Sequence, residues 1–112
     1  MSLGDPEITV YYDGGYESYK IDIELGGITL QIDTLNTCLN SHANLEDFLE
    51  KVELNIECRI ETGRYDTNYI RFCTSEEGGY FEYEYNDGSL ILTIPRRKFE
   101  PALRELLEYL KV

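Results

Sequence analysis

The stretch DGGYESYKIDIELGGITLQID, residues 13–33, decides the fold of this chain. Its residues alternate between apolar and polar, which is the period of a β-strand with one buried and one solvated face. The apolar positions are Tyr19, Ile21, Ile23, Leu25, Ile28, Leu30 and Ile32. The opposite face carries Ser18, Lys20, Asp22 and Glu24. Glycine pairs at 14–15 and 26–27 suit tight turns, because glycine tolerates positive φ. The stretch therefore predicts an antiparallel hairpin.

The same alternation extends in both directions from this hairpin. We expect further strands over residues 8–12, 54–61, 68–74, 80–85 and 89–94. Residues 62–67 and 86–88 contain glycine with asparagine or aspartate, and they predict turns. The residues expected to face inward after position 53 are Leu54, Ile56, Cys58, Ile60, Ile70, Phe72, Phe81, Tyr83 and Tyr85. The segment 33–43 is polar and aperiodic, so it predicts a connection with room for one helical turn.

Two segments have the period of a helix instead. Leu45, Phe48, Leu49 and Val52 follow the i, i+3, i+4, i+7 pattern, and Asn44 is the expected N-cap. A longer apolar stripe near the C-terminus comprises Phe99, Ala102, Leu103, Leu106, Leu107 and Leu110. Proline fits the first turn of a helix, so we expect Pro101 in that turn. A lone amphipathic helix of this length is marginal in water, so this one should cover the apolar face of a sheet.

These elements together predict an α+β fold. It consists mainly of an antiparallel sheet of about seven strands, arranged as hairpins in a meander, with two helices. The long C-terminal helix packs on the sheet. The 112 residues suit a single domain spanning 1–112.

A faint internal repeat runs through these elements. The segment from Asp13 resembles EGGYFEYEYNDGSLILTIP, residues 77–95, in its glycine pair, its tyrosines and its closing apolar strand. A true duplication would give two β-β-β-α halves, 7–52 and 54–112, with the strand from Leu54 as an addition. Hairpins also share turn chemistry, so the similarity has an alternative explanation.

The formal net charge of −12 is the strongest compositional feature. Residues 1–94 hold 19 acidic and 5 basic side chains, whereas residues 95–112 hold 3 and 5. Such a surface repels phosphate, which argues against nucleic acid and against anionic membranes as partners. It favours a basic protein partner, since complementary fields speed association; the alternative is that acidity serves solubility alone. The basic cluster Arg96-Arg97-Lys98 is expected to neutralise acidic groups of the same chain.

The three cysteines predict no disulfide framework. Cys38, Cys58 and Cys73 form no CxxC pair, and we expect reduced thiols that act as small apolar residues. No apolar run approaches the roughly 20 residues of a spanning helix, and residues 1–4 are too short and polar for a signal peptide. The cytoplasm is the expected compartment.

Two pairs of residues are candidates for a chemical site. Cys38 and His42 would share one face of a helix, yet zinc needs three or four such ligands and a nucleophilic pair needs an orienting group. Glu82 and Glu84 share one face of a strand, as paired carboxylates in glycoside hydrolysis do, but a short meander offers little concavity. We expect these glutamates to face Arg71 or Arg59 on neighbouring strands. The sequence therefore predicts no catalytic residue, no metal and no cofactor.

Ten tyrosines and no tryptophan form the second compositional feature. Tyr12, Tyr19, Tyr83 and Tyr85 fall on predicted core faces. Outer-face tyrosines among carboxylates suit a protein interface, although tyrosine also favours strands for its own sake. The predicted interface residues are Tyr11, Tyr16, Tyr69, Tyr80, Glu82 and Glu84.

The leading hypothesis is a non-catalytic, acidic protein-interaction domain that binds a basic protein or a second copy of itself as a homodimer. Bacterial immunity proteins, which neutralise basic toxin domains, include acidic α+β domains of about this size. The similarity is one of size and charge, and no motif in this chain carries it. The alternative is a small enzyme or ligand-binding domain that uses a cleft between sheet and helix, with Glu82 and Glu84 or Cys38 and His42.

Overall fold

A computed structural model describes residues 5–35, 37–62, 68–86 and 88–111 of the chain. The strands are β1 (Glu7–Asp13), β2 (Ser18–Leu25), β3 (Ile28–Asp33), β4 (Cys58–Glu61), β5 (Tyr69–Cys73), β6 (Tyr80–Tyr85) and β7 (Leu90–Pro95). The helices are the 3-10 helix η1 (Cys38–Asn40) and the α-helices α1 (His42–Glu53) and α2 (Arg96–Leu110). Of the predicted turns, residues 63–67 and residue 87 lie outside the described part.

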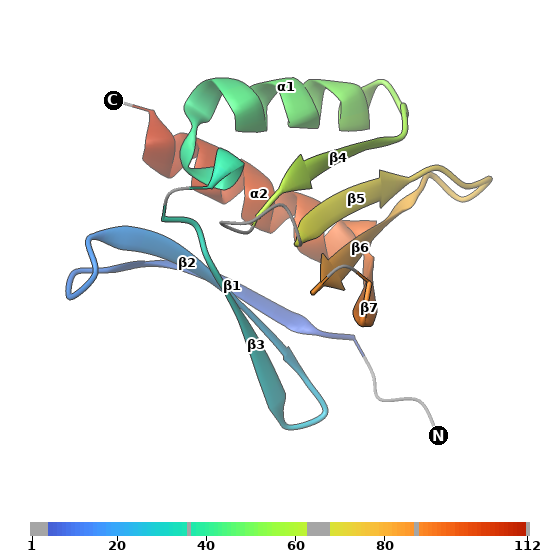
Figure 1. The fold of residues 1–112 in the computed structure, drawn as a ribbon. Helices are drawn as coiled ribbons and strands as arrows, with labels where there is room; N and C mark the ends of the chain where they lie inside the picture. The colour runs from blue at the N-terminus through green and yellow to red at the C-terminus, as the bar shows by residue number, and fades with distance from the viewer. Residues whose placement is uncertain (1–4, 36, 63–67, 87, 112) are drawn as a thin grey trace.

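The strands fold into two antiparallel meanders (Figure 1). One sheet has the order β1-β2-β3 and the other β4-β5-β6-β7. The predicted α+β class and antiparallel pairing are confirmed. The chain leaves the first sheet through η1 and α1, so consecutive strands β3 and β4 lie in different sheets. The element order is β-β-β-α followed by β-β-β-β-α, while the single domain over 1–112 and the duplication of 7–52 and 54–112 stay predictions.

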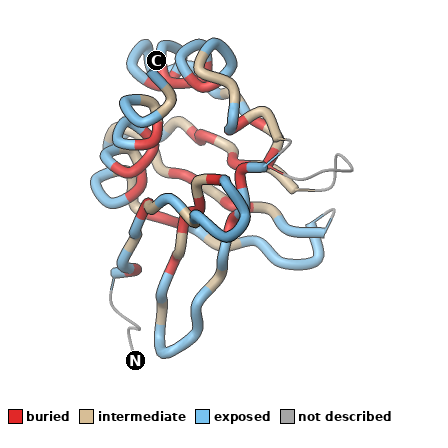
Figure 2. The backbone as a smooth tube through the Cα atoms, turned by 90° about the vertical axis from the view of Figure 1, so that its left-hand side faces the viewer, coloured by how far each residue is buried: buried red, intermediate tan, exposed pale blue. Residues whose placement is uncertain are grey.

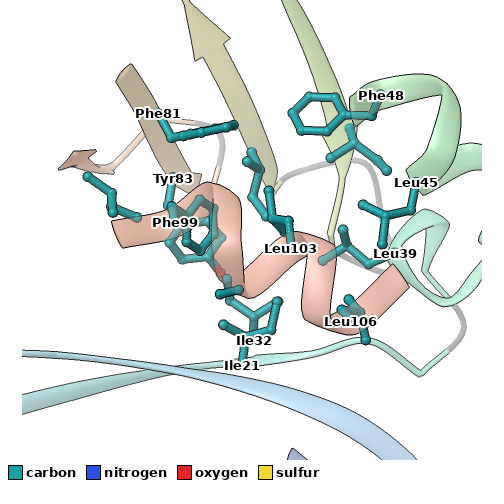
Figure 3. Close-up of a cluster of buried hydrophobic side chains, with 14 of the residues drawn as sticks. Ile21, Ile32, Leu39, Leu45, Phe48, Phe81, Tyr83, Phe99, Leu103 and Leu106 are labelled. Atoms are coloured by element: carbon teal, nitrogen blue, oxygen red, sulfur yellow. The ribbon is translucent and has the colours of Figure 1, made fainter. Parts of the chain in front are cut away.

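α2 is the element that joins the two sheets. It packs on β1 of the first sheet, on β6 and β7 of the second, and against α1. Its buried residues are Phe99, Ala102, Leu103 and Leu106. Figure 3 shows them meeting side chains from both sheets and from α1. The predicted packing of the C-terminal helix on the sheet is therefore confirmed.

Phe81 of β6 lies at the centre of the aromatic part of the core. Its ring centroid is 5.3 Å from that of Phe72, 5.4 Å from that of Phe99 and 6.3 Å from that of Phe48. These distances and the tilted ring planes are those of favourable aromatic pairs. The partners come from β5, α2 and α1, so one side chain connects the second sheet to both helices.

α1 begins earlier than the sequence predicts. Ser41 is the N-cap, and its hydroxyl oxygen accepts a hydrogen bond from the backbone N–H of Asn44 at 3.3 Å. Asn44 therefore lies inside the first turn, and its prediction as the cap is wrong. Thr37 caps η1 in the same way, by accepting from the N–H of Leu39. Two successive hydroxyl caps thus shape this connection, and η1 is the single helical turn for which the sequence left room.

The strand predicted from Leu54 starts only at Cys58. Leu54 is the C-cap of α1, and its N–H donates to the carbonyl of Glu50. Asn55 then adopts a φ of 59°, and the N–H of Ile56 donates to the carbonyl of Lys51. The hydrogen bonds that end α1 thus extend to Ile56. Leu54 and Ile56 are 70% and 49% exposed, so the prediction that they face inward is wrong.

Pro101 lies inside α2 rather than in its first turn. The helix begins at Arg96, with Pro95 as the residue before it. A proline at this depth removes the hydrogen bond that its N–H would make to the carbonyl four residues earlier, at Arg97. The prediction for Pro101 is wrong because the helix begins at Arg96, directly after β7, and not close to Pro101.

Two tyrosines predicted for the core lie outside it. Tyr12 and Tyr85 are exposed, whereas Tyr83 is buried and Tyr19 is half-buried. The ring of Tyr19 stacks on that of Tyr109 from α2, with centroids 5.4 Å apart. Alternation assigns the face of a strand, but it does not show where along the strand the core ends.

The β2–β3 hairpin extends away from both helices, and Figure 2 shows its tip as exposed. Its backbone turns at Gly26 and Gly27, both with positive φ.

None of the helices in the described part of the chain is long and apolar enough to cross a membrane.

Candidate functional site

The outer face of the first sheet collects carboxylates. Alternation along its three strands places Glu7, Asp13, Asp22, Glu24 and Asp33 on the side opposite the core. We call these five residues the acidic face. Its single cation is Lys20, so the face has a formal charge of −4, from five carboxylates and one ammonium.

Lys20 is already neutralised within the face. Its side chain is almost fully buried, and its Nζ lies 2.9 Å from Oδ2 of Asp13 and 4.1 Å from the ring centroid of Tyr16. The hydrogen bond between them raises the pKa of Lys20 and lowers the pKa of Asp13. This pair fixes the end of the β1–β2 hairpin. Asp33 stands opposite Lys20 on β3 and shares its charge, which leaves Glu7, Asp22 and Glu24 without a cation from these strands.

Glu7 and Glu24 lie directly opposite each other on β1 and β2, and both are exposed. Like charges in directly opposed positions destabilise a sheet. Packing does not select this arrangement, since neither side chain is buried. The pair is therefore the part of the acidic face that structure alone explains least.

Tyr11 is held in the middle of the face by a polar network. Its hydroxyl donates to Oδ1 of Asp22 at 3.3 Å and accepts from Nε2 of Gln31 at 2.9 Å. Desolvation, followed by the charge of Asp22, raises the pKa of Tyr11. The ring thus has a fixed orientation among carboxylates, which lowers the entropy cost of using it in a contact.

Four of the six predicted interface residues lie together on the outer face of the second sheet. These are Tyr69, Tyr80, Glu82 and Glu84. Tyr11 belongs to the first sheet, and Tyr16 lies exposed in the β1–β2 turn. The structure therefore divides the predicted set between two sheets.

The outer face of the second sheet carries two arginines among three glutamates, a formal charge of −1. Arg71 stands opposite Glu82 on β6, and its Nη2 lies 3.8 Å from Oε1 of Glu84. Arg59 stands over the ring of Tyr69, with Cζ 4.5 Å from the ring centroid. The expected pairing of these glutamates with Arg71 is present, and such cross-strand contacts account for the residues without a catalytic role.

Cys73 is a buried thiol on this second sheet, where the sequence placed it on the outer face. Its Sγ donates to Oε1 of Glu82 at 3.2 Å. Burial, followed by the hydrogen bond and the charge of Glu82, raises the pKa of Cys73 to about 11. A nucleophilic cysteine needs the opposite shift, so this thiol is poorly suited to attack at neutral pH.

Cys38 and His42 do not share a helix. Cys38 starts η1 and His42 starts α1, with Ser41 in extended conformation between them. Nε2 of His42 lies 3.9 Å from Oε2 of Glu46. No group of three or more His, Cys, Asp or Glu side chains suited to hold a metal occurs in the ranges that the structure describes.

One cavity of about 210 Å³ lies between α1 and β4. Its lining includes Cys38, Phe48, Lys51 and Cys58, and His42 is not part of it. Burial raises the pKa of Cys58, whose Sγ faces the carbonyl of Phe48 at 3.8 Å. The volume is below the range of about 300–1,000 Å³ typical of ligand sites. Because the lining includes Cys38 but not His42, the cavity does not bring together the Cys38 and His42 pair of the enzyme hypothesis.

The basic cluster is used within the chain. Arg96 donates to Oε1 of Glu100 at 2.7 Å, to the carbonyl of Gly78 at 2.5 Å and to that of Val52 at 3.3 Å. Arg97 pairs with Asp5. Arg96 thereby fixes the start of α2 against the second sheet and α1, as the expected intramolecular neutralisation requires.

The comparisons with known proteins find no counterpart: no protein-family model, curated protein or solved structure matches this chain. Any function must therefore be argued from its own residues. All five residues of the acidic face, Glu7, Asp13, Asp22, Glu24 and Asp33, were missed as site residues by reasoning from the sequence. Summing the charge of each predicted strand face, instead of the whole chain, would have found them.

Proposed function

We propose that this chain is a non-catalytic protein-interaction domain that binds a basic protein through the acidic face. The observation that carries the proposal is the concentration of five carboxylates on one sheet face, where Lys20 is buried against Asp13. An inhibitor- or immunity-like role, in which the partner is a basic protein to be neutralised, suits this chemistry. We place the domain in the cytoplasm, since its three cysteines, all in the described part of the chain, form no disulfide with one another.

Electrostatics gives such a face two properties. A field of one sign raises the association rate for an oppositely charged partner by about 10- to 1,000-fold. The effect falls with salt, because the Debye length shrinks from about 30 Å at 0.01 M to about 8 Å at 0.15 M. Opposed carboxylates such as Glu7 and Glu24 cost stability in the free protein, and a cation from a partner placed between them would reverse that cost.

The test is capture of a partner from the source cells with the tagged chain, followed by titration of that partner against variants. The double substitution Glu7→Gln and Glu24→Gln removes two charges from the acidic face. Its matched control, Glu50→Gln and Glu53→Gln, removes two exposed charges from α1. We expect the recovered protein to be basic, with affinity that falls at least tenfold in the first variant and far less in the control.

Salt provides the second criterion. Affinity of the wild-type chain should fall steeply between about 0.02 and 0.3 M NaCl, whereas the Glu7 and Glu24 variant should show a shallower slope. Failure to recover a basic protein, or equal losses in the two variants, would refute the acidic face as the binding surface.

A further inference from the structure

The two sheets have four edge strands, and three of them are protected. An edge exposes unpaired N–H and C=O groups, and proteins usually protect it with charge or by keeping it short. β1 carries Glu7 and Asp13, and β4 spans only four residues. β3 borders the acidic face through Asp33. The fourth edge, β7, differs from all of these.

β7 is an uncharged edge with exposed apolar side chains. Residues 88–95, GSLILTIP, contain no charged group in a chain that is 29% charged. Leu90 and Ile91 are 42% and 51% exposed, and Thr93 is exposed as well. In the described part of the chain the sheet ends at β7, which pairs only with β6 (Figure 1). No other backbone hydrogen bond reaches Leu90–Ile94 from those residues.

We propose that a second copy of this chain covers the β7 edge by pairing antiparallel with it. The two four-stranded sheets would then form one continuous sheet about a two-fold axis. This inference is independent of the acidic face, since β7 belongs to the other sheet.

Charge complementarity favours a second copy as the occupant. Glu84 stands opposite Ile91 near the start of β7, and the exposed Lys98 follows its end, whereas Arg97 is already paired with Asp5. In a two-fold antiparallel pair the end of one strand lies beside the start of the other. Lys98 of each copy therefore approaches Glu84 of its neighbour, while the seam between the two strands carries no charge. Pairing along β3 would instead bring two acidic faces together.

The alternation of β7 also suits a two-fold. Leu90, Leu92 and Ile94 share the inner side of the strand, opposite Tyr85, Tyr83 and Phe81 of β6. A two-fold axis perpendicular to the sheet keeps the inner sides of both copies together. Leu90, Leu92 and the exposed Tyr85 of each copy then belong to one apolar surface that runs across both copies. Contact with the neighbouring copy reduces the exposure of this surface to water.

Sedimentation velocity over about 1–200 µM tests the proposal, with Ile91→Lys as the edge variant. A lysine on an exposed edge opposes strand pairing. The matched control is Thr29→Lys, an exposed position on β3, the corresponding edge of the other sheet. Both substitutions reduce the negative net charge equally, so general repulsion would weaken in both. We expect a dimer for the wild type and the control, and a monomer for Ile91→Lys.

Circular dichroism shows whether each variant is folded. If Ile91→Lys is unfolded, Thr93→Lys serves as the edge variant in its place. Amide hydrogen exchange of wild-type residues 90–94 should slow as concentration rises. A wild type that stays monomeric to 200 µM, open-ended aggregates, or a folded edge variant that still dimerises would each overturn the proposal. The Glu7 and Glu24 variant should dimerise normally, so this failure and that of the proposed function are distinguishable.

Discussion

The surroundings of Gly79 leave no space for a Cβ atom. Gly79 has a φ of +98°, and a Cβ added there would lie 2.5 Å from Cζ of Phe72 and 2.9 Å from the carbonyl oxygen of Cys73. Phe72 is fully buried and cannot move aside without disturbing the aromatic cluster around Phe81. The glycine therefore serves both the β5–β6 turn and the packing of the core beneath it.

The substitution Gly79→Ala should lower the free energy of unfolding by about 2–6 kcal/mol. About 1–3 kcal/mol comes from the strained backbone and a similar amount from overpacking. Gly78→Ala is the matched control, because φ is +105° there but nothing lies within 4 Å of the added Cβ. It should show the backbone cost alone in urea denaturation. Equal losses at both positions would mean that the core can accommodate the methyl group.

Cys73 makes stability depend on pH in the alkaline range. An unfolded thiol has a pKa of about 8.5, while burial and the hydrogen bond to Glu82 raise that of Cys73 to about 11. Between these values the unfolded chain loses the proton and the folded chain keeps it. The unfolded state then binds fewer protons, so the free energy of unfolding falls as the pH rises.

Urea denaturation from pH 7.5 to 9.5 checks this sign. The wild type should lose stability across the range, and Cys73→Ala should lose less, although it starts from a lower value because a buried side chain is truncated. The same tyrosines and lysines titrate in both proteins, so the difference in slope isolates the thiol. Parallel slopes would contradict a raised pKa at Cys73.

Among the elements, α2 contains a residue, Pro101, whose replacement should stabilise the protein. Pro101 is exposed and lies in the second turn, where it gives the helix neither an N–H nor buried contact area. Pro101→Ala restores a donor for the carbonyl of Arg97 and should raise the free energy of unfolding by about 1–2 kcal/mol, after the added freedom of the unfolded chain is subtracted.

Pro95→Ala is the matched control for this prediction. Pro95 precedes the helix with a φ of −58°, where no helical hydrogen bond needs its nitrogen. The control should gain nothing. Thermal unfolding of both variants compares the positions directly, and a loss of stability in Pro101→Ala would show that the ring stiffens the helix usefully.

Local pattern predicted the elements better than it predicted their ends. Alternation found every strand because side-chain direction has a period of two residues. The errors at Asn44 and Leu54 concern caps, where a hydroxyl or a single positive φ decides between neighbouring positions. The division into two sheets depends on α2 packing between distant strands, which no local window contains.

The candidate site was predictable only in part for the same reason. Tyr11 was identified from its position on an outer face, yet its partner Asp22 was not, because their contact spans two strands. That Glu7 stands opposite Glu24 follows from the register of β1 on β2, which depends on the length of the turn between them. Total charge therefore indicated an acidic protein, and pairing was needed to show where the charge gathers.

At the scale of the whole molecule, a net charge of −12 opposes folding. Compact states bring like charges together, and added salt screens the repulsion. Thermal stability should therefore rise from about 0.01 to 0.3 M NaCl. The rise contains a general contribution from the whole surface and a local one from carboxylates held opposite each other.

The Glu7→Gln and Glu24→Gln variant separates these contributions. Removing an opposed like-charge pair should raise the free energy of unfolding at low salt by about 0.2–1 kcal/mol and flatten the salt dependence. Glu50→Gln with Glu53→Gln changes the net charge equally but removes i, i+3 neighbours on a helix instead of directly opposed carboxylates, so it reports the general contribution together with that helical repulsion. A larger gain in the first variant locates a stability cost on the acidic face. Equal gains would mean that the repulsion is general, and the acidic face would then lose the stability argument for a binding role.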